Sequence, residues 1–92
     1  MRDNEIVSEV AGYLKTVEDC FLYRQNSGFS QPAAPIIIIC FKGKFIGLKV
    51  KAGNGKVTVL QEVTLRRIRK AGGIAETVRS VEDVRRILSG LR

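Results

Sequence analysis

Histidine is absent from this sequence, and cysteine occurs only twice, as Cys20 and Cys40. Without histidine, the chain has no imidazole general base and cannot build a zinc site of mixed His and Cys ligands. The two cysteines lack the CxxC spacing of metal and redox motifs, and Cys40 ends an apolar segment where a small apolar side chain fits. We expect both to be buried free thiols. Several classes of enzyme are therefore excluded.

Acidic side chains are absent from a long central stretch, Phe21 to Gln61. The same stretch contains the basic residues Arg24, Lys42, Lys44, Lys49, Lys51 and Lys56. Over the whole chain, 16 Lys and Arg residues outnumber 9 Asp and Glu residues, which gives a net charge of +7. Such a charge favours a polyanionic partner, either nucleic acid or an anionic membrane surface, although a basic soluble protein without such a partner would carry it too.

Long apolar segments are also missing. No run of apolar residues approaches the roughly 20 that span a bilayer. The N-terminal residues MRDNEIVSEV lack the apolar core of a signal peptide. We therefore expect an intracellular, cytoplasmic protein. Its 92 residues, of which 45% are hydrophobic, suit a single folded domain over residues 1–92.

The spacing of apolar residues predicts a helix from Asn4 to about Val17, capped by Asp3 or Asn4. Three strands follow, and the middle one is a continuous β-branched run, typical of a strand buried on both faces of a sheet. A helix that begins at Thr58, a fourth strand and a last helix capped by Ser80 complete the series. The strands are expected at residues 21–25, 36–41, 44–51 and 74–78.

This order, αβββαβα, predicts an α/β fold with a four-stranded mixed sheet flanked by helices. Lys42 and Gly43 form a tight turn, so the strands on either side should pair as a hairpin. The fourth strand follows a helix, and a right-handed crossover should place it parallel to a core strand. Thr58 and Gln61 have the spacing of a capping box. The apolar positions of that helix are expected to be Leu60, Val63, Leu65 and Ile68, and its end is expected at Gly72-Gly73.

Five segments carry a resemblance to a known family. They are Glu5, Tyr23-Arg-Gln-Asn-Ser-Gly28, Pro32-Ala-Ala-Pro35, Gly43-Lys-Phe-Ile-Gly-Leu-Lys-Val-Lys51 and Gly55-Lys-Val-Thr-Val-Leu-Gln61. Each is common by itself. In this order, and with Gly72-Gly73 and Arg79-Ser-Val-Glu-Asp83 after them, they resemble the stand-alone phage and bacterial VRR-NUC (virus-type replication-repair nuclease) domain over nearly the whole chain. That domain belongs to the PD-(D/E)xK superfamily, so the resemblance implies a restriction-endonuclease-like fold.

The resemblance also implies a function, that of a structure-selective DNA endonuclease similar to Holliday junction resolvases. Such enzymes hydrolyse phosphodiester bonds, here of branched or junction DNA, with Mg²⁺ or Mn²⁺ held by clustered carboxylates. The family pattern has an Asp after a PxxP turn, a Glu two residues before a strand lysine, and a Gln in the next helix. Lys51 matches the lysine, Gln61 matches the glutamine and Glu5 matches an acid of the first helix.

Two positions depart from this pattern, because Ile36 stands where the Asp belongs and Lys49 stands where the Glu belongs. Divalent ions require hard oxygen ligands. An ammonium group 4 Å away would repel a 2+ ion by about 8 kcal/mol at an effective dielectric constant near 20. We therefore expect no metal cofactor and little or no nuclease activity, and we interpret the chain as an engineered or catalytically disabled nuclease. Ile36 would then extend the strand packing, and Lys49 would be a solvated lysine at the strand end. Whether Glu9, one helical turn from Glu5, replaces a lost ligand stays open.

The remaining candidate residues are basic or polar and could contact DNA phosphates. Each has an ordinary alternative, such as a solvated helix face or a loop that satisfies its own hydrogen bonds. Lys56 lies near a helix start, where backbone N–H groups favour an anion. The candidates for this electrostatic contact are Arg24, Asn26, Ser27, Lys42, Lys44, Lys56, Arg66, Arg67 and Lys70.

Two other functions stay open. The chain could be a homo-oligomer or a binding module without catalysis, and the resemblance favours a homodimer. It could also carry a reactive lysine at Lys49, because neighbouring cations would lower the pKa of that amine for Schiff-base chemistry.

Overall fold

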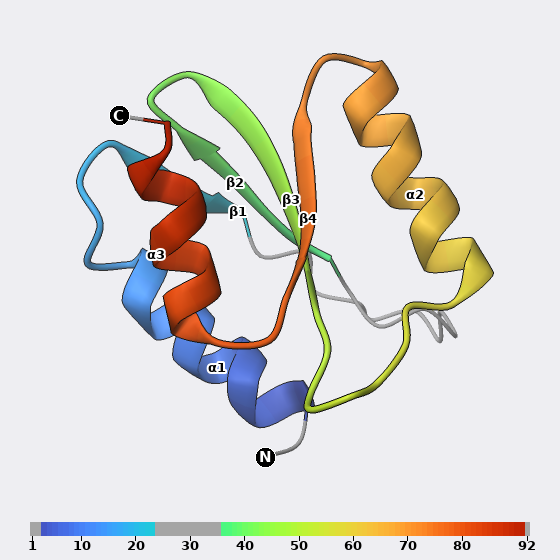
Figure 1. The fold of residues 1–92 in the computed structure, drawn as a ribbon. Coiled ribbons are helices and arrows are strands. Elements are labelled where there is room, and N and C mark those ends of the chain that lie inside the picture. The colour runs from blue at the N-terminus through green and yellow to red at the C-terminus, as the bar shows by residue number, and fades with distance from the viewer. Residues whose placement is uncertain (1–2, 24–35, 92) are drawn as a thin grey trace.

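The computed structural model of the chain describes residues 3–23 and 36–91. Helices and strands follow one another in the predicted order αβββαβα (Figure 1). No helix in the described ranges is both long and apolar enough to cross a membrane. The elements are α1 (Asp3–Leu14), β1 (Cys20–Tyr23), β2 (Ile37–Phe41), β3 (Lys44–Val50), α2 (Val59–Lys70), β4 (Ile74–Val78) and α3 (Val81–Ser89).

The four strands form one sheet in the order β1-β2-β3-β4. β1 pairs with β2 and β2 with β3 in antiparallel fashion, whereas β4 runs parallel to β3. Lys42 and Gly43 both have a positive φ, 52° and 82°, as a two-residue hairpin turn between twisted strands requires. The predicted mixed sheet, its hairpin and its parallel fourth strand are therefore confirmed.

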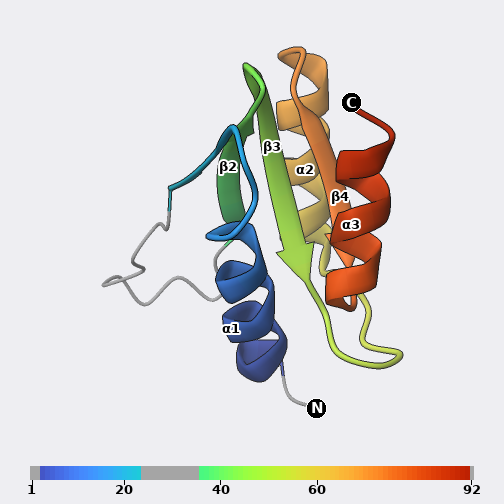
Figure 2. The same ribbon diagram turned by 90° about the vertical axis from the view of Figure 1, so that its left-hand side faces the viewer.

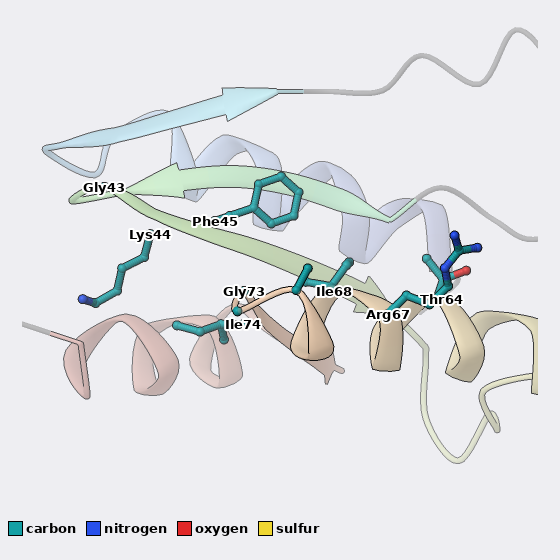
Figure 3. Close-up of a pocket in the computed structure, with 10 residues that line it drawn as sticks. Gly43, Lys44, Phe45, Thr64, Arg67, Ile68, Gly73 and Ile74 are labelled. Atoms are coloured by element: carbon teal, nitrogen blue, oxygen red, sulfur yellow. The ribbon is translucent and has the colours of Figure 1, made fainter.

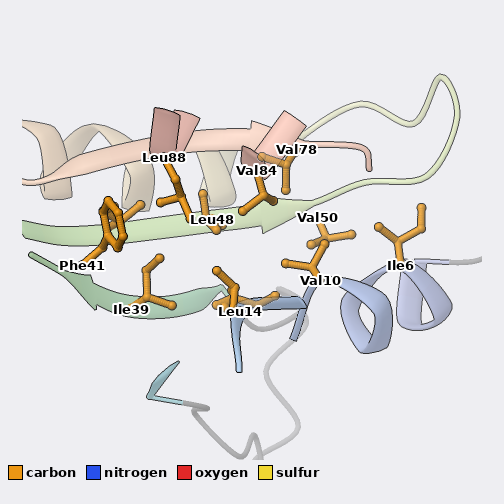
Figure 4. Close-up of a cluster of buried hydrophobic side chains, with 12 residues drawn as sticks. Ile6, Val10, Leu14, Ile39, Phe41, Leu48, Val50, Val78, Val84 and Leu88 are labelled. Carbon is orange, nitrogen blue, oxygen red and sulfur yellow. The ribbon is translucent and has the colours of Figure 1, made fainter. Parts of the chain in front are cut away.

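Helices cover both faces of the sheet, but unequally. Figure 1 shows α1 and α3 on one side and α2 on the other, and Figure 2 shows α1 and α3 together on the near face. The hydrophobic core lies between the sheet and this pair of helices (Figure 4). Its residues are Ile6, Val10, Leu14, Ile37, Ile39, Phe41, Ile46, Leu48, Val50, Val78, Val84 and Leu88.

The second face of the sheet is only half covered, because α2 packs mainly against β4 and β3. The prediction that residues 36–41 are buried on both faces is therefore wrong: Ile38 is half-buried and Cys40 is exposed. Cys40 was expected to be a buried thiol, and the missing cover over β2 explains the difference. Two predicted inward residues of α2, Leu60 and Val63, are exposed as well.

α2 begins with the predicted capping box. Thr58 accepts a hydrogen bond from the backbone N–H of Gln61 (3.2 Å), and the Gln61 side chain accepts one from the N–H of Thr58 (3.0 Å). These bonds satisfy two N–H groups that have no backbone carbonyl partner within the helix. They also fix where α2 starts relative to the end of β3.

Replacing Thr58 with Ala should lower the free energy of unfolding by about 1 kcal/mol, because the first turn of α2 loses its cap. Thr64→Ala is the matched control, since the exposed Thr64 hydroxyl bonds only to the carbonyl of Leu60 in the same helix. That change should be neutral or stabilising. Urea denaturation of both variants tests the prediction, and equal losses in the two would contradict it.

Candidate functional site

Ile36 and Lys49, the two positions that depart from the family pattern, lie at the same end of the β2–β3 hairpin. The register pairs Ile37 with Leu48, so Ile36 and Lys49 are the next positions along the two chains. A Cβ added to Gly47 would lie 3.4 Å from Cγ2 of Ile36. Ile36 therefore lies on the same sheet face as Gly47. Lys49 shares this face, because side chains alternate along a strand.

Lys49 is buried, with only 1% of its surface exposed. The prediction of a solvated strand-end lysine is therefore wrong, because Lys49 lies on the sheet face that packs against α2 and its side chain is enclosed there. Burial lowers the pKa of Lys49, the positive charge of Lys51 lowers it further, and the carboxylate of Asp3 acts in the opposite direction. The buried ammonium therefore lies within the electrostatic reach of one cation and one anion.

Asp3 is the member of this site that the sequence did not reveal. It was expected only as a possible cap of the first helix, but its Oδ1 accepts a hydrogen bond from the backbone N–H of Ala52 at 2.7 Å. This bond ties the first turn of α1 to the chain that leaves β3. The only signal in the sequence was the acidic first turn that Asp3 forms with Glu5. Glu5 itself is exposed on that turn.

Gln61 lies on the inner side of α2 and is 2% exposed. Ile68, in the later part of α2, lies against the middle of β3, since its Cδ1 would be 2.7 Å from a Cβ on Gly47. The first turn, which carries Gln61, follows the loop that leaves β3 after Val50. Gln61 has a structural role, because its side chain completes the capping box at Thr58.

This arrangement does not suit a divalent metal ion. Within residues 3–23 and 36–91, no three His, Cys, Asp or Glu side chains come close enough together to hold one. At the two positions where the family pattern has carboxylates, the chain presents a branched hydrocarbon side chain, Ile36, and an amine, Lys49. Neither supplies an anionic oxygen. The residues present therefore do not fit Mg²⁺ or Mn²⁺, and no hydrolytic step can be derived from them.

The basic candidates in the described residues lie in three places on the structure. Lys42 and Lys44 lie at the turn of the β2–β3 hairpin, and Lys44 is five residues, or roughly 17 Å of extended strand, from Lys49. Lys56 lies in the loop before α2, at the other end. Arg66, Arg67 and Lys70 are exposed on α2 between them. Arg24, Asn26 and Ser27 lie outside the described residues.

A groove connects the hairpin turn with α2 (Figure 3). Its volume is about 830 Å³, and Phe45, Ile68 and Ile74 supply its apolar lining. Lys44 and Arg67 line it as well, and no acidic residue does. Neither of these two cations belongs to an ion pair within the described part of the chain, where the pairs join Arg69 to Glu62, Arg85 to Glu82 and Arg86 to Asp83. The groove is therefore apolar on its floor and positive at its rim.

Comparisons with protein-family models, with curated proteins and with solved structures found no match to this chain. The resemblance to the VRR-NUC domain therefore rests on the motifs of the sequence.

Replacing Lys49 with Met should raise the free energy of unfolding at pH 7, because the folded protein disfavours the charged amine, as the lowered pKa of Lys49 indicates. The folded-state pKa of Lys49 lies below the ordinary value of 10.5. At pH values between the folded-state pKa and 10.5, the Lys49 amine is protonated more fully in the unfolded chain than in the folded protein. The unmodified protein therefore becomes more stable as the pH rises through this range. The advantage of Lys49→Met should therefore shrink as the pH approaches 10.5.

Urea titrations at a series of pH values measure this difference. Lys44→Met is the control, because Lys44 is exposed. A Lys49→Met variant whose advantage stayed constant over the alkaline range would show that the pKa of Lys49 is not lowered.

Proposed function

We propose that this chain is a VRR-NUC-like domain of the PD-(D/E)xK superfamily that has lost its metal site, and that it binds DNA without cutting it. One observation carries the proposal: Ile36 and Lys49, the two departures from the family pattern, are neighbouring positions on two antiparallel strands. Two residues of one former metal site have to meet in this way. The element order and the parallel β3–β4 pair also support a restriction-endonuclease-like fold.

The buried amine explains how the scaffold could persist without metal. A cluster of carboxylates in this position would need a cation to offset their burial. Lys49 places a cation of its own there, and the Asp3 carboxylate favours the charged form of that amine. Ile36 adds apolar contact beside Gly47. An intracellular location belongs to the proposal as well.

DNA binding is the activity that the charge distribution favours. Lys56, Arg66, Arg67 and Lys70 are exposed, and the net charge of the chain is +7. Phosphate contacts by such side chains release counterions, so binding should weaken steeply with salt. The junction or branched DNA expected from the resemblance is the first ligand to test.

A reactive lysine fits the structure less well, because it needs access for a carbonyl compound and Lys49 is 1% exposed. A homodimer needs an exposed apolar surface, and the first half of α2 provides one. Its residues Val59, Leu60 and Val63 are 80%, 55% and 37% exposed.

Restoring both acids, as Ile36→Asp with Lys49→Glu, should give a protein that cleaves a four-way DNA junction with Mg²⁺ or Mn²⁺, whereas the unmodified chain should not cleave it. The reason is that two carboxylates would return to adjacent positions beside Lys51. Adding Lys51→Met to the double variant should abolish cleavage again, which excludes a contaminating nuclease. Circular dichroism verifies that each variant is folded.

Either of two results would contradict this account. Cleavage by the unmodified chain would show that its metal ligands lie elsewhere. A folded double variant that binds the junction but does not cut it would show that the scaffold is a binding module.

Replacing Arg67 with Gln should weaken binding to a DNA duplex and reduce the slope of log K against log salt by about 1, the loss expected for one phosphate contact. Arg85→Gln is the matched control, because Arg85 lies on α3 across the sheet and pairs with Glu82. Fluorescence anisotropy at several salt concentrations gives both slopes. If the two variants gave equal slopes of log K against log salt, α2 would not be part of the binding surface.

A further inference from the structure

Three aromatic side chains are exposed on the sheet face that α2 leaves uncovered. Phe21 is 68%, Tyr23 55% and Phe45 50% exposed. The neighbouring residues of β1, Cys20 and Leu22, pack against the core on the opposite face, so the alternation along the strand directs Phe21 and Tyr23 away from it. Exposed aromatic residues in a group are unusual on the surface of a small protein and indicate a binding surface.

The pairing of the strands arranges these aromatics in an order. Phe21 pairs with Cys40 and Cys40 pairs with Phe45, so the two phenylalanines lie in one row across three strands with a small residue between them. Two strand spacings separate them, which is roughly 10 Å. Tyr23 is two residues further along β1, about 7 Å from Phe21. Ile38 and Gly47 continue the row that Tyr23 begins.

Phe45 is held in place from one side. A Cβ added to Gly73 would lie 3.2 Å from Cδ1 of Phe45, so one edge of the ring rests against the α2–β4 turn. Half of its surface still faces solvent. The same ring lines the groove that Lys44 and Arg67 border (Figure 3). This groove thus combines a planar apolar surface with the Arg67 cation, which has no ion-pair partner in the described residues. Lys44 alternates with Phe45, so it leaves β3 on the other side and borders only the end of the groove.

We propose that this face, formed by Phe21, Tyr23 and Phe45 with Lys44 and Arg67 at its rim, binds single-stranded nucleic acid. Unpaired bases stack on the aromatic rings, and the phosphates between them lie against the two cations. This inference rests on the proposed DNA binding and specifies it, because it makes the unpaired strands of a branched molecule the preferred ligand.

Two other occupants are less suitable for this face. A duplex stacks its bases inside and presents only phosphates and groove edges, so exposed rings would gain little from it. A second copy of the chain in a symmetric dimer would set the same patch against itself and would bring the positive rims of both copies into one interface. No acidic residue of the groove would offset that repulsion. The charge of the rim therefore favours a polyanion.

The test compares the affinity for a fluorescein-labelled oligothymidylate with that for a hairpin duplex of the same length, both at low ionic strength. Phe21→Leu and Phe45→Leu keep an apolar side chain but lose the aromatic ring. Each should weaken binding to the oligothymidylate on the order of tenfold and leave the duplex affinity unchanged. Phe21→Tyr and Phe45→Tyr keep a ring, so they should bind the oligothymidylate as the unmodified chain does.

Cys40 offers a second measurement that requires no substitution, because it is exposed between Phe21 and Phe45. A maleimide should label it in the free protein, and the oligothymidylate should slow this labelling whereas the duplex should not. Mass spectrometry of peptides distinguishes the label on Cys40 from any label on the half-buried Cys20.

The possible outcomes separate this inference from the proposed function. Suppose that the chain binds the duplex in a salt-dependent way, that the Leu variants bind the oligothymidylate as tightly as the unmodified chain, and that the oligothymidylate does not slow Cys40 labelling. The inference then fails and DNA binding stands. If it binds neither ligand, both fail. If the unmodified chain is a dimer by analytical ultracentrifugation and Phe21→Leu is a monomer, the face is an interface between copies and the inference is overturned.

Discussion

The antiparallel register of β2 and β3 is the constraint on which the functional interpretation depends. It brings Ile36 and Lys49 together at one end of the hairpin, and it sets Cys40 beside Phe45 near the other. The two-residue turn at Lys42 and Gly43 fixes this register, because both residues have the positive φ that such a turn requires. A slip by one residue would move every side chain of β3 to the opposite face. The meeting of Ile36 with Lys49 and the aromatic row would then both be lost.

Lys49 illustrates how a small fold accommodates a buried charge. Burial of the amine lowers its pKa, as does the charge of Lys51, and the Asp3 carboxylate opposes that change. Asp3 is in turn held by the N–H of Ala52, 49 positions away in the sequence. The site therefore joins two distant parts of the chain, the start of α1 and the end of β3. Its electrostatics depend on how those parts pack.

Local signals predicted most of the fold. The capping box at Thr58 and the strand at residues 74–78 are found where the pattern indicated them, because a cap and a short β-branched strand are encoded by adjacent residues. The features that the sequence did not reveal depend on which faces of the sheet the helices cover. The apolar run before Phe41 indicates a strand but not how many of its faces are covered, and α2 packs mainly against β3 and β4. The exposure of Cys40, the burial of Lys49 and the bond from Asp3 to Ala52 all follow from where helices pack, which no local pattern specifies.

The contact between α1 and α3 has a consequence for the way the protein is made. The core joins Ile6 and Val10, near the start of the chain, to Val84 and Leu88, near its end. During synthesis, α1 leaves the ribosome first, and its apolar side has no complete partner surface until β3, β4 and α3 have followed. The hairpin and its neighbouring strands can form earlier, since their contacts are closer in sequence. A chain whose synthesis ended before Leu88 would therefore have an incomplete core. Such a fragment would be a substrate for chaperones and proteases.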